Sequence, residues 1–468
     1  MNRKLKLWDA VMLVMGSMIG SGIFIVSADM MRNLGSGFWL IVVWIITGVM
    51  TIAAAISYGE LSALFPKAGG QYTYITKIFG KMSGFLYGWG LFTVIQTGTI
   101  AAVAMAFSKF TAYLIPSLNE AAPIFQQGEF QITWIQILSI FVIIFLTYIN
   151  TRGIKNGKIV QDIFTAAKII ALLGIIFLGF ILVKNSHWSE NMSFGTQVFQ
   201  NLKNTSWQPI SGLALMGGIA AAMVGSVFSS VAWENVTFMS GEIENPKKNV
   251  VKSMVLGTSV VMVLYLLINL VYLNVLDRDG IAFALKDRTA VAASQQIFGE
   301  VGTIIIAVLV MISTFGCING MVFAGSRVFQ TMAKDGLFFK AAIENNKNGV
   351  PGKSLWMQCF WACVLALSGQ YGDLLDMISF VIVLFYMITV FGVIYLRFKS
   401  PELERPYKTW LYPITPLIYL LIGTTFCVLL IFYKPQYTWP GFILILLGVP
   451  VYLFINRNKK NINEIEEI

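Results

Sequence analysis

The sequence predicts an all-α integral membrane protein with twelve transmembrane helices, and three observations support this fold class. Hydrophobic residues make up 57% of the 468 residues and charged residues only 12%, so the chain has more apolar surface than a soluble core of this length could bury. The apolar residues come in stretches of about 20, the length of helix that crosses roughly 30 Å of hydrocarbon. Lysine and arginine gather in every second loop between these stretches.

The expected spans form a single transmembrane domain over residues 1–468, divided into 8–184, 213–396 and 410–456. Five spans fall in the first part, five in the second and two in the third. In chain order, they are 8–31, 38–63, 83–115, 132–151, 159–184, 213–240, 250–276, 298–332, 354–369, 372–396, 410–433 and 437–456.

The distribution of basic residues predicts the orientation of the chain. If the amino terminus lies on one side, that side receives 24 Lys and Arg residues and the other side 7, while 2 fall within spans, which accounts for all 33. Because basic loops favour the cytoplasm, we expect both termini to be cytoplasmic and the number of spans to be even. The same distribution explains the net charge of +10 without a nucleic-acid partner.

Two expected spans carry small and polar residues at their middles. The first has GSMIGSGIF at Gly16 to Phe24, and the sixth has SVFSSVAWENVTF at Ser226 to Phe238. Backbone freed from helical pairing in hydrocarbon survives only where protein or a cavity satisfies it. The pair therefore predicts a LeuT-type 5+5 inverted repeat, with helices 1 and 6 broken and two further helices at the carboxyl end. The alternative for the first span is an unbroken helix in which Gly16 and Gly20 form a GxxxG contact.

Six motifs, in order along nearly the whole chain, resemble the amino acid, polyamine and organocation (APC) transporter superfamily, and most closely its L-type amino acid transporter branch. They are GSMIGSGIF (16–24), SYGELSALFPKAGGQYTYI (57–75), VQDIFTAAKIIAL (160–172), SGEIENPKKNV (240–250), GCINGMVFAGSRVF (316–329) and PELERPYKTWLYPITP (401–416). The resemblance implies a transporter, and not an enzyme.

The two breaks are expected to bind a zwitterionic amino acid through backbone groups. Free N–H groups at the start of the second half of helix 1 would hold the carboxylate, with help from the helix dipole. Carbonyls that end the first half, and those of the helix 6 break, would accept hydrogen bonds from the ammonium. The expected substrate-binding residues are Met18, Ile19, Gly20, Ser21 and Gly22 in helix 1, and Phe228, Ser229, Ser230, Val231 and Trp233 in helix 6.

Two aromatic residues flank the break in helix 6. The resemblance implies that Phe228 is a gate that closes over the substrate from outside and that Trp233 is a wall of the site. Without the resemblance, packing or lipid contact would explain each of them equally well.

Lys168 lies about ten residues into helix 5, where a charged side chain costs roughly 2.5–3.5 kcal/mol at mid-membrane. We therefore expect it to face the interior of the bundle, although snorkelling to the cytoplasmic edge is the alternative. The resemblance implies that its ammonium replaces a sodium ion, reaching the helix 1 carbonyls and Ser313, Thr314 or Asn319 of helix 8.

Glu234 departs from the L-type pattern, in which an asparagine commonly follows the tryptophan, and resembles the glutamate of acid-stress antiporters in the same superfamily. Such a carboxyl could carry or sense a proton, or pair with a cationic substrate. The alternative is a hydrogen-bonded or solvated acid with no part in coupling.

Other polar positions give weaker expectations. Gln96 and Thr97 could line the path or form interhelical hydrogen bonds. Glu60 is expected in an internal gate or surface pair with a base such as Arg327, and 287–299 resembles a short external loop helix.

The leading functional prediction is secondary active transport of L-α-amino acids across the cytoplasmic membrane, as sodium-independent exchange of neutral amino acids by alternating access. The alternative is a proton-coupled symporter or antiporter of charged amino acids that uses Glu234. A channel would show a symmetric filter repeat, and an enzyme would need a catalytic dyad or metal cluster. The sequence has neither, and its single histidine, His187, falls in an expected loop, so no metal or cofactor is expected.

The expected partners are an amino acid substrate and the bilayer. The loop at 117–133, between helices 3 and 4, contains no cysteine, and all four cysteines fall within or at the edge of expected spans. Since the resemblance places the heavy-chain cysteine in that loop, we expect no disulfide-linked heavy chain. A monomer or weak homodimer in the cell membrane is expected.

Overall fold

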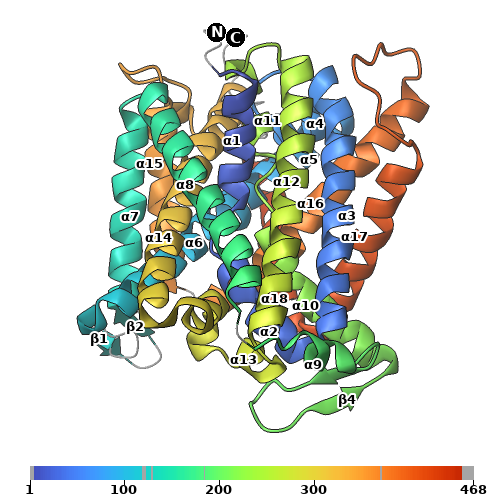
Figure 1. Ribbon diagram of the computed structural model, residues 1–468. Coiled ribbons are helices and arrows are strands. Elements are labelled where there is room, and N and C mark those ends of the chain that lie inside the picture. Colours follow the sequence, from blue (N-terminus) through green and yellow to red (C-terminus); the bar gives the residue numbers. More distant parts are fainter. Residues whose placement is uncertain (1–4, 119–122, 128–129, 184, 369–370, 456–468) are drawn as a thin grey trace, which may run out of the picture.

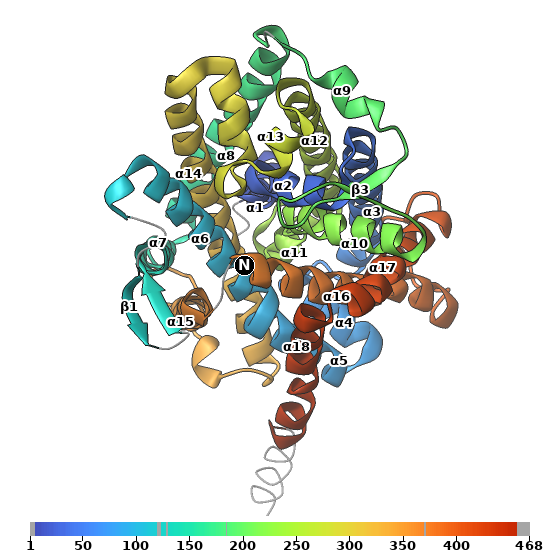
Figure 2. The ribbon, with the colours of Figure 1, turned by 90° about the horizontal axis from the view of Figure 1, so that it is seen from below.

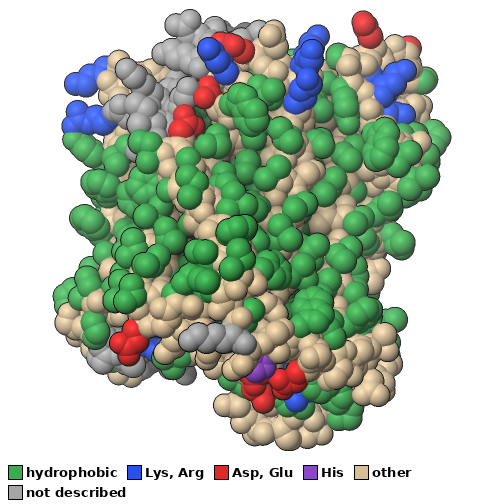
Figure 3. Space-filling model, in the orientation of Figure 1, with side chains coloured by type: hydrophobic (Ala, Val, Ile, Leu, Met, Phe, Trp, Pro, Cys, Tyr) green, Lys and Arg blue, Asp and Glu red, His purple; other side chains and the backbone are tan. Residues whose placement is uncertain are grey.

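The computed structural model describes residues 5–118, 123–127, 130–183, 185–368 and 371–455. Long helices run side by side through the molecule, while the strands lie at one end (Figure 1). The opposite end, where α1 (Leu7–Met18) and α12 (Pro246–Val275) begin, carries most of the visible Lys and Arg, above a broad band of apolar side chains (Figure 3). We call it the basic end.

The helices of the first half match the first five expected spans, apart from residue 184, which lies outside the described residues. Their bounds are α1 (Leu7–Met18), α2 (Gly22–Leu34), α3 (Gly37–Leu64), α4 (Gly70–Phe79), α5 (Lys81–Gly90), the π-helix η1 (Leu91–Ile95), α6 (Gln96–Leu114), the 3-10 turn η2 (Pro116–Leu118), α7 (Trp134–Thr151) and α8 (Ile154–Ile181).

The second half follows after the short helix α9 (Trp188–Ser193). Its elements are α10 (Gly212–Ser229), α11 (Asn235–Phe238), η3 (Ser240–Glu242), α12 (Pro246–Val275), α13 (Arg278–Ala282), η4 (Leu285–Asp287), α14 (Thr289–Lys334), η5 (Lys340–Ala342), α15 (Gly352–Ser368), α16 (Tyr371–Lys399), α17 (Ile414–Tyr433) and α18 (Pro435–Leu446).

Two small antiparallel sheets lie outside the helical bundle, so the described chain is not purely α-helical. The strands β1 (Pro123–Gln127) and β2 (Phe130–Thr133) pair in the loop before α7. The strands β3 (Val198–Gln200) and β4 (Gln208–Ile210) pair in the loop before α10. Each hairpin joins two long helices at the end opposite the basic end.

Within the described residues, ten helices are long and apolar enough to cross a membrane, or eleven if the bent pair α1 and α2 counts as one span. The expected ninth span corresponds to α15, which has only 17 residues. Its expected last residue, 369, and residue 456 of the expected twelfth span lie outside the described part of the chain. Ten or eleven spanning helices therefore stand where the sequence predicts twelve.

Both expected interruptions are present as breaks in helices. The axes of α1 and α2 differ by 41°, and Ile19 at the break is extended, with ψ of 90°. The helix α10 ends at Ser229, and α11 begins only at Asn235. Within that second gap Ala232 takes a φ of +71°, a left-handed conformation that costs a non-glycine residue roughly 1–2 kcal/mol. Ala232 is buried, so the surrounding packing holds it in this conformation.

The broken helices lie inside the bundle. The helix α1 packs against α8, α12 and α14, and α2 packs against α10. Seen along the bundle, α1 and α2 lie among α8, α12, α14 and α10 (Figure 2). The expected loop helix before helix 8 is the first part of α14, which kinks at Gly299 (φ +69°).

Candidate functional site

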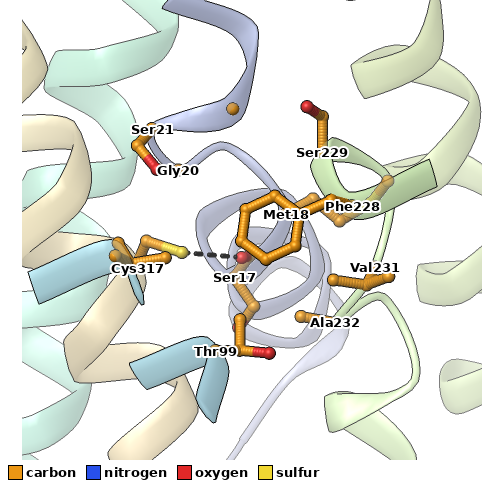
Figure 4. A pocket seen from close by; sticks show the side chains of 12 residues that line it. Ser17, Met18, Gly20, Ser21, Thr99, Phe228, Ser229, Val231, Ala232 and Cys317 are labelled. Atoms are coloured by element: carbon orange, nitrogen blue, oxygen red, sulfur yellow. Dashed lines mark hydrogen bonds between the residues drawn. The ribbon is translucent and has the colours of Figure 1, made fainter. Parts of the chain in front are cut away.

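A small closed cavity lies between the two breaks. It has room for about one water molecule, with a volume near 10 Å³. Its walls come from the α1–α2 break, the end of α10 and the residues that follow it, two positions of α6 and one of α14 (Figure 4). The lining residues are Ser17, Met18, Gly20, Ser21, Gly22, Thr99, Val103, Phe228, Ser229, Val231, Ala232 and Cys317.

Hydrogen-bond donors face this region from the start of α2. The first N–H groups of a helix have no carbonyl partner within it, and they carry the positive end of the helix dipole. Among the described residues, none accepts a hydrogen bond from the N–H of Gly20 or Gly22. Gly22 also lies close to α10, because an added Cβ would come within 2.9 Å of the Ser229 Cβ. The two breaks therefore approach each other at Gly22.

The carbonyls of the two breaks differ in their hydrogen bonding. The Tyr265 hydroxyl donates to the Met18 carbonyl at 2.8 Å, and the Ser313 hydroxyl donates to the Ile19 carbonyl at 3.1 Å. By contrast, no described residue donates to the carbonyls of 229–231, at the end of α10 and just beyond it. The carbonyls without a partner among the described residues therefore lie in the break between α10 and α11, which is the predicted break of helix 6.

The Phe228 side chain fills much of the space between the breaks. Its ring lies at the centre of the pocket, directed from α10 towards Ser17 and Cys317 (Figure 4), and the residue is only 4% exposed. Because the remaining cavity is about the size of a water molecule, an amino acid could enter only if this ring moved.

Lys168 on α8 is fully buried. Its ammonium donates to the carbonyls of Gly16 at 2.6 Å, Ile19 at 2.7 Å and Ser313 at 3.2 Å. Lys168 therefore faces the bundle interior and does not snorkel to the edge. It joins α8 to the end of α1 and to α14, and these are the contacts that the family resemblance implies.

Asn319 binds elsewhere on α8 and on α7. Its amide nitrogen donates to the Gln161 side-chain oxygen at 3.3 Å, and its own oxygen accepts from Asn150 at 2.9 Å. Of the three helix 8 residues expected near the ammonium, Ser313 supplies the carbonyl, whereas the Thr314 hydroxyl donates to Val310 in its own helix at 2.8 Å.

Trp233 and Glu234 lie on the side of the helix 6 break away from the closed cavity. The Trp233 ring packs edge-on against Tyr58, with centroids 4.8 Å apart, and is tilted against Tyr386 at 5.2 Å. Trp233 and Ser230 line a second small cavity between α3, α10, α16 and α17. Neither they nor Ile19 line the first cavity. Glu234 is 2% exposed, and its Oε2 has no hydrogen-bond partner among the described residues.

Several residues that line the cavity are not among those predicted from the sequence. Thr99 and Val103 lie on α6, close to Gln96 and Thr97, which were considered instead. Gln96 donates to the Met321 carbonyl at 2.8 Å, and Thr97 donates to Phe92, so both make helix contacts. A third such residue, Cys317, falls in the helix 8 motif, and its Sγ donates to the Ser17 carbonyl at 3.0 Å.

The expected pairing of Glu60 with Arg327 is wrong. Glu60 accepts hydrogen bonds from Arg397 Nη2 at 2.6 Å, from Arg405 Nε at 3.0 Å and from the Thr409 N–H at 2.8 Å. Arg327 instead pairs with Glu242 at 3.1 Å. The loop after α16 therefore closes over the basic end of α3.

No group of three metal-ligating side chains occurs in the described part of the chain.

Sequence comparisons with known proteins match almost the whole chain. A family model for amino acid permeases matches residues 5–454. The human large neutral amino acids transporter small subunit 2 is 30% identical over 455 residues, which cover 97% of this chain and 80% of that protein. The mouse Asc-type amino acid transporter 1 is 28% identical, covering 97% and 81%. The human cystine/glutamate transporter is 28% identical, covering 98% and 87%.

These relatives are transporters of amino acids in name, and the matched region includes both broken helices, the cavity between them and Lys168. The chain therefore belongs to the amino acid permease family of the APC superfamily, and it is a membrane transporter and not an enzyme.

Proposed function

We propose that this protein exchanges neutral L-α-amino acids across the cell membrane by alternating access, without sodium. The observation that carries the proposal is the cavity between the breaks. Among the described residues, the N–H groups of Gly20 and Gly22 on one side and the carbonyls of 229–231 on the other have no hydrogen-bond partner. A carboxylate suits the first group and an ammonium the second. None of the lining side chains is charged, which favours a neutral substrate side chain.

The proposed architecture has twelve helices, with α15 as the short ninth span and the broken helices 1 and 6 at equivalent positions of an inverted 5+5 repeat. We place the basic end and both termini in the cytoplasm, because basic residues favour that side. Rocking of the broken helices would then expose the site to each side in turn.

Lys168 supports the absence of sodium. Its ammonium already supplies a positive charge to the Gly16 and Ile19 carbonyls, where a sodium ion could otherwise be coordinated. A fixed cation at this position ties helix 1 to helix 5 without depending on a sodium gradient.

The relatives named as small subunits imply a second subunit for those proteins. For this chain we propose a monomer or weak homodimer without a disulfide-linked heavy chain. The support is the absence of cysteine from the loop at 117–133 and the placement of all four cysteines in helices.

Glu234 motivates the second candidate, a proton-coupled transporter of charged amino acids. The carboxyl is buried, and its Oε2 accepts no hydrogen bond from any residue that the structure describes. The titratable groups that face it are hydroxyls of Tyr58 on α3, Tyr87 on α5, Tyr386 on α16 and Tyr419 on α17. Proton binding would remove a buried negative charge from this cluster.

Uptake into proteoliposomes tests the leading proposal. Labelled neutral amino acids should accumulate only when the vesicles contain unlabelled amino acid, and a sodium gradient should change nothing. Uptake that requires sodium, or that proceeds equally into empty vesicles, would refute sodium-independent exchange.

The variant Glu234→Gln separates the two candidates. If Glu234 couples proton movement, exchange by the natural protein should depend on pH and exchange by Glu234→Gln should not. The control is Glu300→Gln, at an exposed position of α14. Unchanged pH dependence in Glu234→Gln would remove Glu234 from the coupling mechanism.

A further inference from the structure

A large apolar groove opens at the basic end, away from the substrate cavity. Its volume is about 1060 Å³, above the roughly 300–1,000 Å³ that is usual for small-molecule sites. The walls come from α5 and η1, from the loop after α14, from α15 and from the segment 451–455 that follows α18. Along one wall, Phe85 and Phe92 are seven residues apart, which corresponds to roughly 10 Å of helix.

Aromatic side chains dominate the groove, and several of them face outward. Phe360 and Phe454 are 68% and 67% exposed, and Trp356 is 43% exposed. The indole nitrogens of the deeper Trp89 and Trp361 donate to backbone carbonyls, at 2.8 Å and 3.1 Å, so these rings present apolar surface. In a membrane protein such a surface faces lipid and favours acyl chains.

One part of the groove is cationic. Lys340 in η5 and Lys353 at the start of α15 are its only charged lining residues among those described. Lys340 forms no ion pair within the described part of the chain, and both lysines are exposed. Lys353 lies 3.3 Å from Glu344, but both side chains are more than half exposed, so this pair contributes little.

We propose that this groove binds an anionic phospholipid from the leaflet at the basic end, with its acyl chains on the aromatic wall and its phosphate at Lys340 and Lys353. Charge complementarity selects the headgroup, because a basic pocket between membrane helices attracts anionic lipid. A second copy of the chain would bring the same lysines against each other, which disfavours a symmetric protein contact here. The site is independent of the substrate and of the direction of transport.

Native mass spectrometry of the full-length protein tests the proposal, with phosphatidylglycerol and phosphatidylcholine of identical acyl chains as probes. The natural protein should retain phosphatidylglycerol preferentially. The variant Lys340→Gln/Lys353→Gln should lose this preference by about fivefold for each lysine, from the usual contribution of one basic residue near a lipid surface. The variant Trp356→Ala/Phe360→Ala should instead retain less of both lipids.

The matched control is Lys247→Gln/Lys248→Gln, which removes two exposed lysines of α12 at the same end of the molecule. It should behave like the natural protein. Equal retention of the two lipids by the natural protein, equal losses in both lysine variants, or a dimer that forms through this face and excludes lipid would each overturn the proposal.

Discussion

Replacing Lys168 by methionine tests the contact between α8 and the α1–α2 break, which we call the brace: the hydrogen bonds from the Lys168 ammonium to the carbonyls of Gly16 and Ile19. Methionine keeps most of the side chain's length and removes its charge and its three hydrogen bonds. The loss is uneven, since the Ile19 carbonyl keeps the Ser313 hydroxyl as a donor. Gly16 has no other donor to its carbonyl among the described residues.

The magnitude follows from that one orphaned carbonyl. Leaving a buried acceptor unpaired costs about 1–3 kcal/mol. If the braced state is the one that exchanges substrate, its population falls by about 5- to 150-fold. Protein yield should change little, because the variant also removes a buried ammonium that is itself costly in the membrane.

The assay is exchange of labelled neutral amino acid in proteoliposomes, with and without sodium on either side. Lys168→Met should lose at least about fivefold in exchange rate, while Lys168→Ala should lose transport altogether. Lys81→Met, at the exposed start of α5, is the control and should be unaffected. Full exchange by Lys168→Met at normal yield would refute the brace, and a sodium requirement in the natural protein would refute the substitution of lysine for sodium.

Three further predictions concern the same region and its support. Gly22→Ala should reduce exchange at least tenfold, because its methyl group would meet Ser229 across the breaks. The control is Gly174→Ala on α8, whose methyl group would meet nothing within 4 Å and should leave exchange unchanged. Equal exchange rates in the two variants would contradict the close approach of the breaks. Phe228→Ala removes a ring whose burial contributes about 1.5–3 kcal/mol, so the maximal exchange rate should fall while Phe228→Leu retains more of it; unchanged kinetics in Phe228→Ala would exclude a gate. Glu60→Gln removes the carboxylate from its buried contacts with Arg397 and Arg405, and losing one partner of a buried ion pair costs roughly 3–5 kcal/mol. The melting temperature in detergent should therefore fall, with little change in KM. An unchanged melting temperature would show that these ion pairs do not stabilise the protein.

The sequence predicts the broken helices well, because the signal is local. Small and polar residues in the middle of an apolar span mark the break at Ile19 and the one before Asn235, and each break lies where its motif lies. The interior position of Lys168 is also predictable, since a charged side chain at this depth in the membrane must find a partner. Its contact with the helix 1 carbonyls is implied only by the family resemblance.

Contacts set by helix rotation are not predictable in this way. Thr99, Val103 and Cys317 line the cavity because of how α6 and α14 turn against the breaks. The predicted partner of Glu60 was wrong for a related reason. Its actual partner Arg397 lies 337 residues further along the chain, and nothing in the sequence favours Arg397 over Arg327. The π-helix η1 likewise could not be predicted from the sequence patterns described above.

The different hydrogen bonding of the two breaks assigns them different roles. Side chains from α8, α12 and α14 donate to the carbonyls of Gly16, Met18 and Ile19, so the helix 1 break is held by its surroundings whether or not substrate is present. No residue in the described part of the chain donates to the carbonyls of 229–231, and the Phe228 ring beside them must move before an amino acid fits. A substrate ammonium that binds these carbonyls would therefore stabilise the helix 6 break at the moment the ring is displaced. Binding energy would then favour movement of helix 6 relative to helix 1, whose carbonyls Lys168 binds, and this would couple occupancy of the site to the change of access.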